Sequence, residues 1–264
     1  MCRLLGWAGS SPRTLGEVLG EPGRSTFTNL SKLHDDGWGV ASVAEPAMAP
    51  TVARSTSPAF SDELLAQATS TSNAACLVHF RKASPGLVVD LANTHPFVYG
   101  TVAFAHNGSI SPQARLDEIV TGPWRERLVG TTDSERYFLA VMSEVEAGRS
   151  MTEAIDTVVT RVTREFETSS LNAMFLTPEA LYVVNSHDPA RAPGPEMEPD
   201  GQPYYQLRVR RSADLVVVAS SGFPQTDEDG WEMLRNHTLL VVDLLTVGTT
   251  TLPLGSNQFV GSHE

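Results

Sequence analysis

Cysteine is scarce in this sequence: only Cys2 and Cys76 occur among 264 residues, and there is no Cys-x-x-Cys pair. Two cysteines cannot build the disulfide framework of a small secreted protein, and the missing pair excludes a structural zinc knuckle. No apolar run approaches the roughly 18 residues of a transmembrane helix, so we expect no membrane span. A signal peptide is also missing, since Gly6 ends the short apolar run after Arg3, and we expect a cytoplasmic protein.

Positively charged residues are also few, with 19 Lys and Arg against 31 Asp and Glu, so the formal net charge is −12 at pH 7. A protein of this charge is repelled by phosphate backbones and anionic lipids, so we expect neither nucleic acid nor a membrane surface as a partner. The glycine-rich loops of dinucleotide-binding and P-loop proteins are absent, as is the Gly-x-Ser-x-Gly turn of serine hydrolases. The sequence therefore carries no common signature of nucleotide binding or serine hydrolysis.

Short apolar runs rich in β-branched residues recur along the chain and predict strands. These runs cover 3–8, 38–43, 75–80, 102–106, 171–176, 181–184, 215–220 and 239–242. Helical periodicity predicts helices over 61–68, 111–120, 134–146 and 151–166. Strands come in groups with helices between the groups, which predicts an α+β fold rather than a doubly wound parallel sheet. We expect a single domain over 1–254, a surface loop over 186–203 and a flexible tail over 255–264.

The position of Cys2 is chemically unusual. Removal of Met1 would place its thiol beside a free α-amine, whose ordinary pKa near 7.7–8.0 suits a general base at neutral pH. N-terminal threonine enzymes activate their nucleophile in this way. The alternative is a small buried residue that opens the first strand. Cys76 lies within an apolar run and is expected to be a core residue.

Asn107 and Gly108 form an Asn-Gly pair after a predicted strand. The side-chain amide of the first and the backbone N–H of the second could stabilise the oxyanion of an acyl-transfer reaction. Asn-Gly is also a strong hairpin signal, so a tight turn is the alternative interpretation.

Arg81 and Asp133 meet the complementary needs of a free amino acid. A guanidinium can grip an α-carboxylate through two parallel hydrogen bonds, and a carboxylate can accept from an α-ammonium. The alternatives are a surface ion pair for Arg81 and a helix cap for Asp133.

Three histidines, His79, His95 and His106, lie near these residues in sequence without the spacing of a zinc pair. We therefore expect packed, hydrogen-bonded histidines and no metal site. The stretch 36–39, Asp-Gly-Trp-Gly, is either a turn that enters a strand or one wall of a pocket near Cys2.

The ordered set of these stretches resembles the class II glutamine amidotransferases, above all their stand-alone members with a Met-Cys-x-x-Leu-Gly start, which include the γ-glutamyl hydrolase of ergothioneine biosynthesis. The resemblance is carried by Cys2, Asp36-Gly37-Trp38-Gly39, His79-Phe80-Arg81-Lys82-Ala83-Ser84, Asn93-Thr94-His95-Pro96-Phe97, His106-Asn107-Gly108 and Thr132-Asp133-Ser134-Glu135. It implies the N-terminal-nucleophile hydrolase fold, a four-layer αββα sandwich with two antiparallel sheets.

The resemblance also implies roles for individual residues. Cys2 would be the nucleophile and its freed amine the base, with Asn107 and Gly108 as the oxyanion hole. Arg81 would hold the substrate α-carboxylate and Asp133 its α-ammonium. Three further residues are implied at the substrate: Ser84, which stands where the family has threonine, His95, whose role is not fixed, and Trp38.

The implied activity is hydrolysis of the γ-carboxamide of glutamine, or of a γ-glutamyl amide, through a thioester on Cys2. No metal or organic cofactor is needed for these steps. A separate synthase could use the released ammonia. Two alternatives stay open: hydrolysis of the γ-glutamyl intermediate of ergothioneine biosynthesis, and a catalytically silent amino-acid-binding or scaffold protein, which retention of Met1 would favour.

Overall fold

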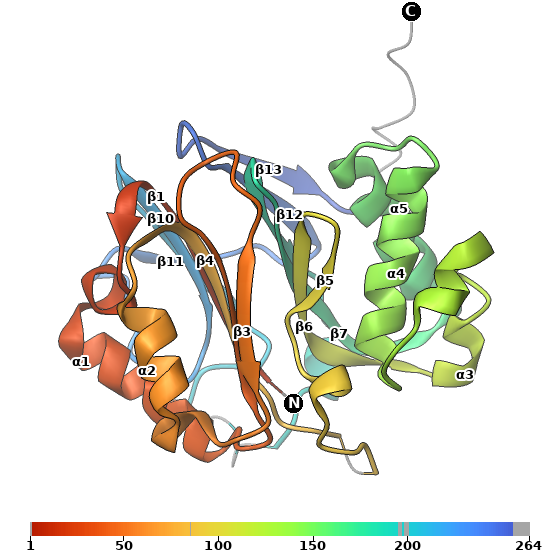
Figure 1. Cartoon of the computed structure of the whole chain (residues 1–264), viewed down its shortest axis with the longest axis horizontal. Helices are drawn as coiled ribbons and strands as arrows, with labels where there is room; N and C mark the ends of the chain where they lie inside the picture. Colours follow the sequence, from red (N-terminus) through yellow and green to blue (C-terminus); the bar gives the residue numbers. More distant parts are fainter. Residues whose placement is uncertain (1, 85, 195–196, 198–200, 256–264) are drawn as a thin grey trace, which may run out of the picture.

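The computed structural model describes residues 2–84, 86–194, 197 and 201–255, and within them the strands form two antiparallel sheets (Figure 1). The first sheet has the order β11-β9-β10-β1-β4-β2-β3. Its strands are β1 (Arg3–Arg13), β2 (Trp38–Val43), β3 (Thr51–Ser55), β4 (Asn73–Phe80), β9 (Leu207–Arg211), β10 (Leu215–Ser220) and β11 (Trp231–Met233). The second has the order β13-β12-β8-β7-β6-β5. Its strands are β5 (Phe97–Tyr99), β6 (Val102–Ser111), β7 (Glu167–Leu176), β8 (Ala180–Asn185), β12 (Thr238–Asp243) and β13 (Thr249–Pro253).

Helices cover the outer face of each sheet, as Figure 1 shows. The first sheet is covered by α1 (Leu15–Asn29) and α2 (Glu63–Ser70). The second is covered by α4 (Asp133–Glu146) and α5 (Met151–Glu165), with the short α3 (Gln113–Leu116) beside them. The layers are therefore helix, sheet, sheet, helix, and the predicted αββα sandwich is confirmed.

The central strand β1 shows why residues 4–8 form an apolar run. Leu4 and Ala8 point into the core between the two sheets, whereas Leu5 and Trp7 point into the core beneath the helices α1 and α2. Side chains alternate between the two faces of a strand, and here both faces are buried. A strand buried on both faces reads as a continuous apolar run rather than as an alternating one.

Several elements differ from the sequence-based expectations. The helix α1 was not predicted, since it contains Pro22 and a break at Gly20, whose φ is +71°. The predicted helix 111–120 is reduced to the four residues of α3. Gly255 is a described residue whose N–H donates to the Asp156 side chain at 2.8 Å, and the rest of the predicted tail, 256–264, lies outside the described residues.

The predicted loop 186–203 is confirmed where the structure describes it, with one short 3₁₀ helix at Pro189–Arg191, while residues 195, 196 and 198–200 lie outside the described set. In the described part of the chain, no helix is both long and apolar enough to cross a membrane.

Candidate active site

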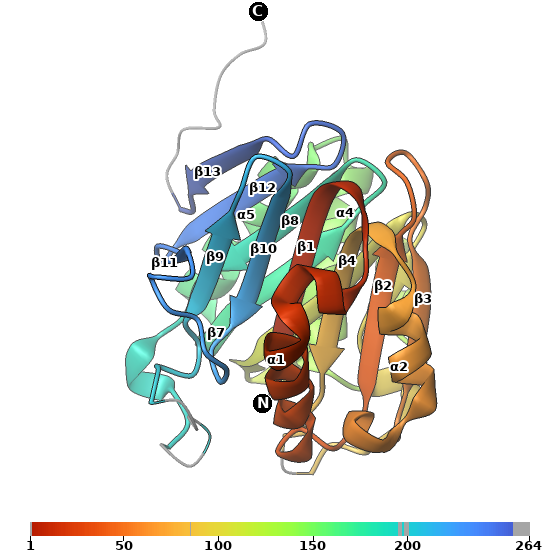
Figure 2. The same ribbon diagram turned by 90° about the vertical axis from the view of Figure 1, so that its left-hand side faces the viewer.

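Strand register brings Cys2 to the end of β4. The strands β1 and β4 lie side by side (Figure 2). In this antiparallel pair Arg3 lies opposite Phe80, so Cys2 lies beside the residues that follow β4. Its thiol accepts from the N–H of Lys82 at 3.5 Å and lies 3.7 Å from the carbonyl oxygen of the same residue. The thiol of Cys2 is therefore in contact with the main chain of the residue two positions after β4.

The start of β2 lies at the same edge of the sheet. Trp38 pairs with Phe80, and the backbone pairing continues as Arg81 N–H donates to the Gly37 carbonyl at 2.8 Å. The carboxylate of Asp36 accepts from the N–H of Ala83 at 2.8 Å. The stretch 36–39 is thus hydrogen-bonded to the stretch 80–83. These bonds fix the loop after β4, which contacts the Cys2 thiol.

Asn107 reaches Cys2 from the second sheet. The side-chain Oδ1 of this buried residue accepts from the main-chain nitrogen of Cys2 at 2.9 Å. An N–H donor requires an oxygen opposite it, which fixes the orientation of the amide. The Nδ2 atom is then buried with no hydrogen-bond partner among the described residues. A buried amide donor without a partner is costly, and here it is available to a ligand.

Gly108 lies inside β6 and not in a turn, so the tight-turn interpretation is wrong. A Cβ at this position would lie 1.9 Å from the carbonyl oxygen of Ser170, so only glycine fits. Its partner in β7 is Leu171, which donates its own N–H to Ser186 at 2.7 Å. Gly108 and Leu171 are therefore opposite each other without exchanging hydrogen bonds. In such a pair both N–H groups point outward, so the Gly108 N–H points away from β7.

Arg81 is buried and is not part of a surface ion pair. Its guanidinium donates to the carbonyl oxygens of Asp36 and Val88, each at 3.2 Å. The two bonds hold the planar group at the wall of the pocket that also contains Cys2. Two neutral carbonyl acceptors leave its positive charge uncompensated by these contacts, which suits a site that receives an anion.

Asp133 is the first residue of α4, and Thr132 is the N-cap, with its hydroxyl accepting from Glu135 N–H at 3.1 Å. The carboxylate of Asp133 accepts from the backbone N–H of Ile110 at 2.7 Å, which ties α4 to the end of β6. It also accepts from Ser134 N–H at 2.9 Å. Thr132 and not Asp133 is therefore the helix cap, and Asp133 lines the pocket.

His106 is buried with hydrogen-bond partners at both ring nitrogens. Its Nε2 lies 3.0 Å from the carbonyl oxygen of Ser170, which can only accept, so the proton is on Nε2. Its Nδ1 then accepts from the hydroxyl of Ser134 at 2.9 Å. Burial lowers the pKa of His106, although the nearby Asp133 carboxylate opposes this shift. The ring joins β6, β7 and α4 beneath the pocket.

His79 and His95 contact each other at the pocket wall, with ring centroids 4.3 Å apart and ring planes inclined by 48°. Both are buried, and neither ring has a hydrogen-bond partner within the described residues. Burial lowers the pKa of each well below its ordinary value, and the neighbouring charges act in the same direction. The expectation of packed histidines is confirmed, but only His106 of the three is hydrogen-bonded.

One pocket brings together most of the predicted residues. Its lining includes Cys2, Arg81, Ser84, His95, Gly108 and Asp133, with Lys82, Ala83, Leu87, Asn93, His106, Thr132 and Ser134 completing it. Asn107 joins it through its contact with Cys2. In the described ranges, no cluster of three histidine, cysteine or acidic side chains is arranged to hold a metal ion.

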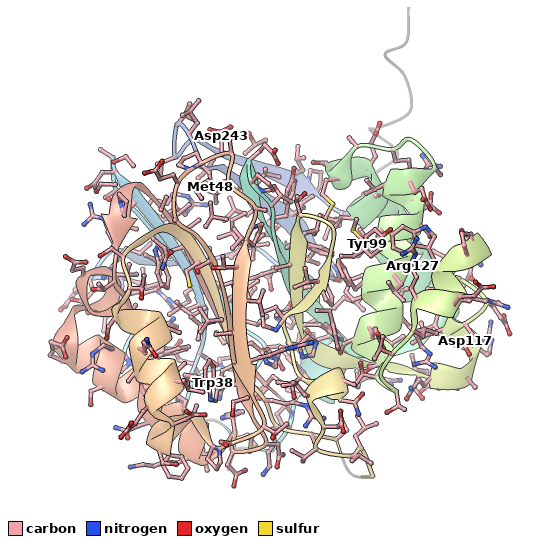
Figure 3. The ribbon with its side chains drawn as sticks, viewed as in Figure 1. Trp38, Met48, Tyr99, Asp117, Arg127 and Asp243 are labelled. Carbon is pink, nitrogen blue, oxygen red and sulfur yellow. The ribbon has the colours of Figure 1, made fainter. Side chains whose placement is uncertain are left out.

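Trp38 is the exception among the predicted substrate-binding residues. Its indole lies on the helix side of its sheet, where Nε1 donates to Asp62 at the start of α2 at 2.9 Å (Figure 3). Side chains alternate along β2, so the neighbour that faces the second sheet is Gly39, where a Cβ would meet the His95 carbonyl at 2.1 Å. We therefore drop Trp38 from the substrate-binding set.

Sequence reasoning missed one contact on Cys2. The hydroxyl of Tyr204 donates to the carbonyl oxygen of Cys2 at 2.9 Å, across 202 positions of sequence. The pair Tyr204-Tyr205 between a proline-rich loop and a strand carries no motif, so only the fold shows this contact.

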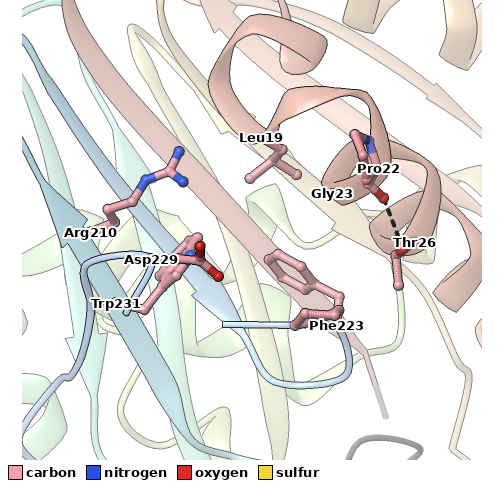
Figure 4. Close-up of a pocket in the computed structure, with 9 residues that line it drawn as sticks. Leu19, Pro22, Gly23, Thr26, Arg210, Phe223, Asp229 and Trp231 are labelled. Atoms are coloured by element: carbon pink, nitrogen blue, oxygen red, sulfur yellow. Dashed lines mark hydrogen bonds between the residues drawn. The ribbon is translucent and has the colours of Figure 1, made fainter. Parts of the chain in front are cut away.

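A second pocket, of about 260 Å³, lies between α1 and the strands β9 and β11 (Figure 4). Arg210 crosses it with its guanidinium 5.2 Å from the ring of Trp231, and the same group donates to the Val18 carbonyl. None of the predicted site residues lines this pocket.

Comparisons with known proteins agree with this geometry. The sequence model of the family described as glutamine amidotransferases class-II matches residues 1–244. The probable glutamine amidotransferase DUG3 of Saccharomyces cerevisiae is 24% identical, over 94% of this chain and 83% of its own. A γ-glutamyl-hercynylcysteine sulfoxide hydrolase of Mycobacterium tuberculosis is 24% identical, over 96% of this chain and 97% of its own length.

Two solved structures share the fold. A class-II glutamine aminotransferase domain protein from Silicibacter pomeroyi superposes with a TM-score of 0.64 and 21% identity, covering 97% of this chain and all of its own. The glutamine phosphoribosylpyrophosphate amidotransferase of Bacillus subtilis gives a TM-score of 0.65 and 16% identity, over 97% of this chain and 50% of its own. Because the family match spans nearly the whole sequence, the chain belongs to the class II glutamine amidotransferases, a family of enzymes.

Proposed function

We propose that this protein hydrolyses the γ-carboxamide of glutamine, or of a γ-glutamyl amide, through a γ-glutamyl thioester on Cys2. The observation that carries the proposal is the orientation of Asn107. Its Oδ1 is occupied by the Cys2 nitrogen, and its Nδ2 is buried without a partner among the described residues. An acyl-transfer reaction requires a hydrogen-bond donor beside the thiol that is free to bind the developing oxyanion.

The first half of the reaction transfers the acyl group to sulfur. Removal of Met1 turns the Cys2 nitrogen into a primary amine, which accepts the thiol proton. The sulfur bonds to the γ-carbon, and the Nδ2 of Asn107 and the N–H of Gly108 stabilise the resulting oxyanion. The protonated amine then delivers its proton to the leaving nitrogen as the carbon–nitrogen bond breaks.

The second half releases the product. Ammonia or an amine leaves, and a water molecule attacks the thioester carbon with the α-amine of Cys2 again acting as base. The carbon–sulfur bond breaks, glutamate departs and the thiol regains its proton. These steps use no metal or organic cofactor.

Substrate orientation follows from the two charged walls of the pocket. Arg81 holds the α-carboxylate, and Asp133 accepts from the α-ammonium, which leaves the γ-carbon directed at Cys2. Both groups are fixed by main-chain contacts, Arg81 to two carbonyls and Asp133 to the N–H of Ile110. Ser84 and His95 complete the wall. Preformed charges of this kind cost little to organise when the substrate arrives.

The leaving amine separates two versions of the proposal. The mycobacterial relative is named a hydrolase of a γ-glutamyl compound, and this chain matches 97% of its length, which favours a hydrolase with a bulky leaving amine. The Bacillus subtilis amidotransferase, of which the chain matches half, favours release of ammonia to a synthase that would here be a separate partner.

The test is glutamate release from L-glutamine and from γ-glutamyl-p-nitroanilide, with Cys2→Ala as the blank. Release from glutamine supports a glutaminase, and release only from the anilide supports a γ-glutamyl hydrolase. No release from either by protein that lacks Met1 would contradict the proposal and favour a silent amino-acid-binding role. The buried Cys76 provides the matched control, because Cys76→Ala should retain turnover.

A further inference from the structure

Tyr204 lies directly behind the nucleophile. It is fully buried, and its hydroxyl donates to the Cys2 carbonyl oxygen at 2.9 Å. On the other side of the same residue, Asn107 accepts from the Cys2 nitrogen. The main chain of Cys2 is therefore held at both of its polar atoms, the nitrogen by Asn107 of β6 and the carbonyl oxygen by Tyr204, which precedes β9.

His34 lies beside the Tyr204 hydroxyl. Its Nδ1 lies 2.7 Å from the carbonyl oxygen of Leu30, so Nδ1 carries a proton, and its Nε2 lies 3.2 Å from the hydroxyl oxygen. Burial, reinforced by the charge of Arg3, lowers the pKa of His34 to about 3, so the ring is neutral at physiological pH. Its Nε2 is then an acceptor, so the single hydroxyl proton of Tyr204 lies between two acceptors, the Cys2 carbonyl at 2.9 Å and the more distant Nε2 of His34.

Arg3 fixes the ring of Tyr204 on its face. The guanidinium carbon lies 4.1 Å from the ring centroid, and Nη1 donates to the Tyr204 carbonyl at 3.3 Å and to the Ser221 hydroxyl at 3.1 Å. Gly222, with φ of +109°, allows the chain to pass the guanidinium, because a Cβ there would lie 3.2 Å from its carbon. A cation over an aromatic face adds attraction to this packing.

We infer that Tyr204 is a positioning residue that orients the main chain of Cys2, and with it the thiol and the α-amine, for attack on the substrate. The inference rests on the proposed function. Both reacting groups of Cys2 are attached to one Cα, so a rotation of this residue misplaces the nucleophile and the base together. Small misplacements of reacting groups cost large factors in rate, whereas the carboxylate and ammonium contacts of the substrate lie elsewhere.

Tyr205 offers a matched control in the next position. It is also buried, and its hydroxyl donates to the Ser169 hydroxyl at 2.9 Å rather than to Cys2. Replacing either tyrosine with phenylalanine removes one hydroxyl and keeps the ring, so Tyr204→Phe preserves the packing of Arg3 on the ring. The two variants differ in whether the lost hydrogen bond ends on the nucleophile.

The experiment measures kcat and KM for glutamate release, and the rate of Cys2 alkylation by iodoacetamide, in wild type, Tyr204→Phe and Tyr205→Phe. We expect Tyr204→Phe to lose at least tenfold in kcat and severalfold in alkylation rate with KM unchanged. Tyr205→Phe should keep all three values. Wild-type values in Tyr204→Phe, equal losses in both variants, or a change confined to KM would each overturn the inference. If wild type releases no glutamate, the proposed function fails, and the alkylation rates still decide the role of Tyr204.

Discussion

The side-chain oxygen of Asn107 lies 2.9 Å from the main-chain nitrogen of Cys2, and this contact joins the two sheets at the proposed nucleophile. Cys2 precedes β1 in the first sheet, and Asn107 lies within β6 of the second. The sandwich fold thus places an amide from one sheet on the N-terminal residue of the other. The nitrogen of the same amide is buried without a partner in the described chain, and we propose that it binds the oxyanion.

Asn107→Asp separates the two functions of this amide. An aspartate keeps an oxygen opposite the Cys2 nitrogen but replaces the Nδ2 donor with a second acceptor that repels an oxyanion. We expect kcat to fall by about 10²–10³, the range for loss of one oxyanion donor, with KM within a fewfold of wild type. Steady-state kinetics with glutamine tests this, and kcat within tenfold of wild type would remove Asn107 from the oxyanion hole.

Gly108→Ala tests the close approach of β6 to β7. The added Cβ would lie 1.9 Å from the Ser170 carbonyl, and backbone cannot give way as a flexible side chain can. We expect the free energy of unfolding to fall by about 1–3 kcal/mol or more, together with a loss of turnover. Urea denaturation measures the first effect, and a variant as stable as wild type would show that the two strands are not this close.

Arg81→Lys tests recognition of the α-carboxylate. Lysine keeps the positive charge but loses the planar fork, and a charged hydrogen bond contributes about 1.5–3 kcal/mol. We therefore expect KM for glutamine to rise about tenfold or more, while kcat changes less. The half-exposed Arg191, which pairs with Glu167 at 3.1 Å, provides the control, since Arg191→Lys should leave KM unchanged. An unchanged KM in Arg81→Lys would refute its role.

Stability should fall in mild acid. Burial lowers the pKa of His34, His79, His95 and His106 in the folded protein below the ordinary value of 6.5. The unfolded chain therefore binds more protons as pH falls below about 6.5, and each histidine then costs up to about 1.4 kcal/mol of stability per pH unit, for His34 down to a pH of about 3.

The urea midpoint measured at pH 8, 7, 6 and 5 checks this prediction. It should be flat between pH 8 and 7 and fall steeply from pH 6 to 5, with proton uptake on unfolding at pH 5. Equal midpoints at pH 7 and 5 would mean that these histidines are charged or exposed in the folded protein.

Strands buried on both faces were predictable from the sequence. Trp38–Val43 and Leu215–Ser220 have the predicted bounds, because a continuous apolar run begins and ends where burial does. The edge strands Thr51–Ser55 and Thr249–Pro253 escaped prediction, since most of their residues are exposed and polar. The helix α1 escaped because glycine and proline within it argue against a helix, although Thr14 and Glu17 form a capping box at its start.

The site was partly predictable for a different reason. Cys2, Arg81, Asn107 and Asp133 lie in polar stretches whose order along the chain resembles the family, and this resemblance implied their roles; strand register then brings them together. Trp38 was expected at the substrate but lies on the other face of its sheet. A motif gives no information about which face of a strand a residue occupies. Tyr204 was missed because its role depends on a contact across 202 positions, which neither spacing nor composition reveals.

The central claim is that Cys2, as the N-terminal residue, forms the covalent bond to substrate. Its most direct test is the mass of the N-terminal peptide after inactivation by the diazoketone analogue of glutamine, which alkylates the nucleophile it meets. The account predicts a peptide that lacks Met1, begins with Cys2 and carries one adduct, with Cys76 unmodified. An adduct on Cys76, or an active protein whose peptide still carries Met1, would contradict it.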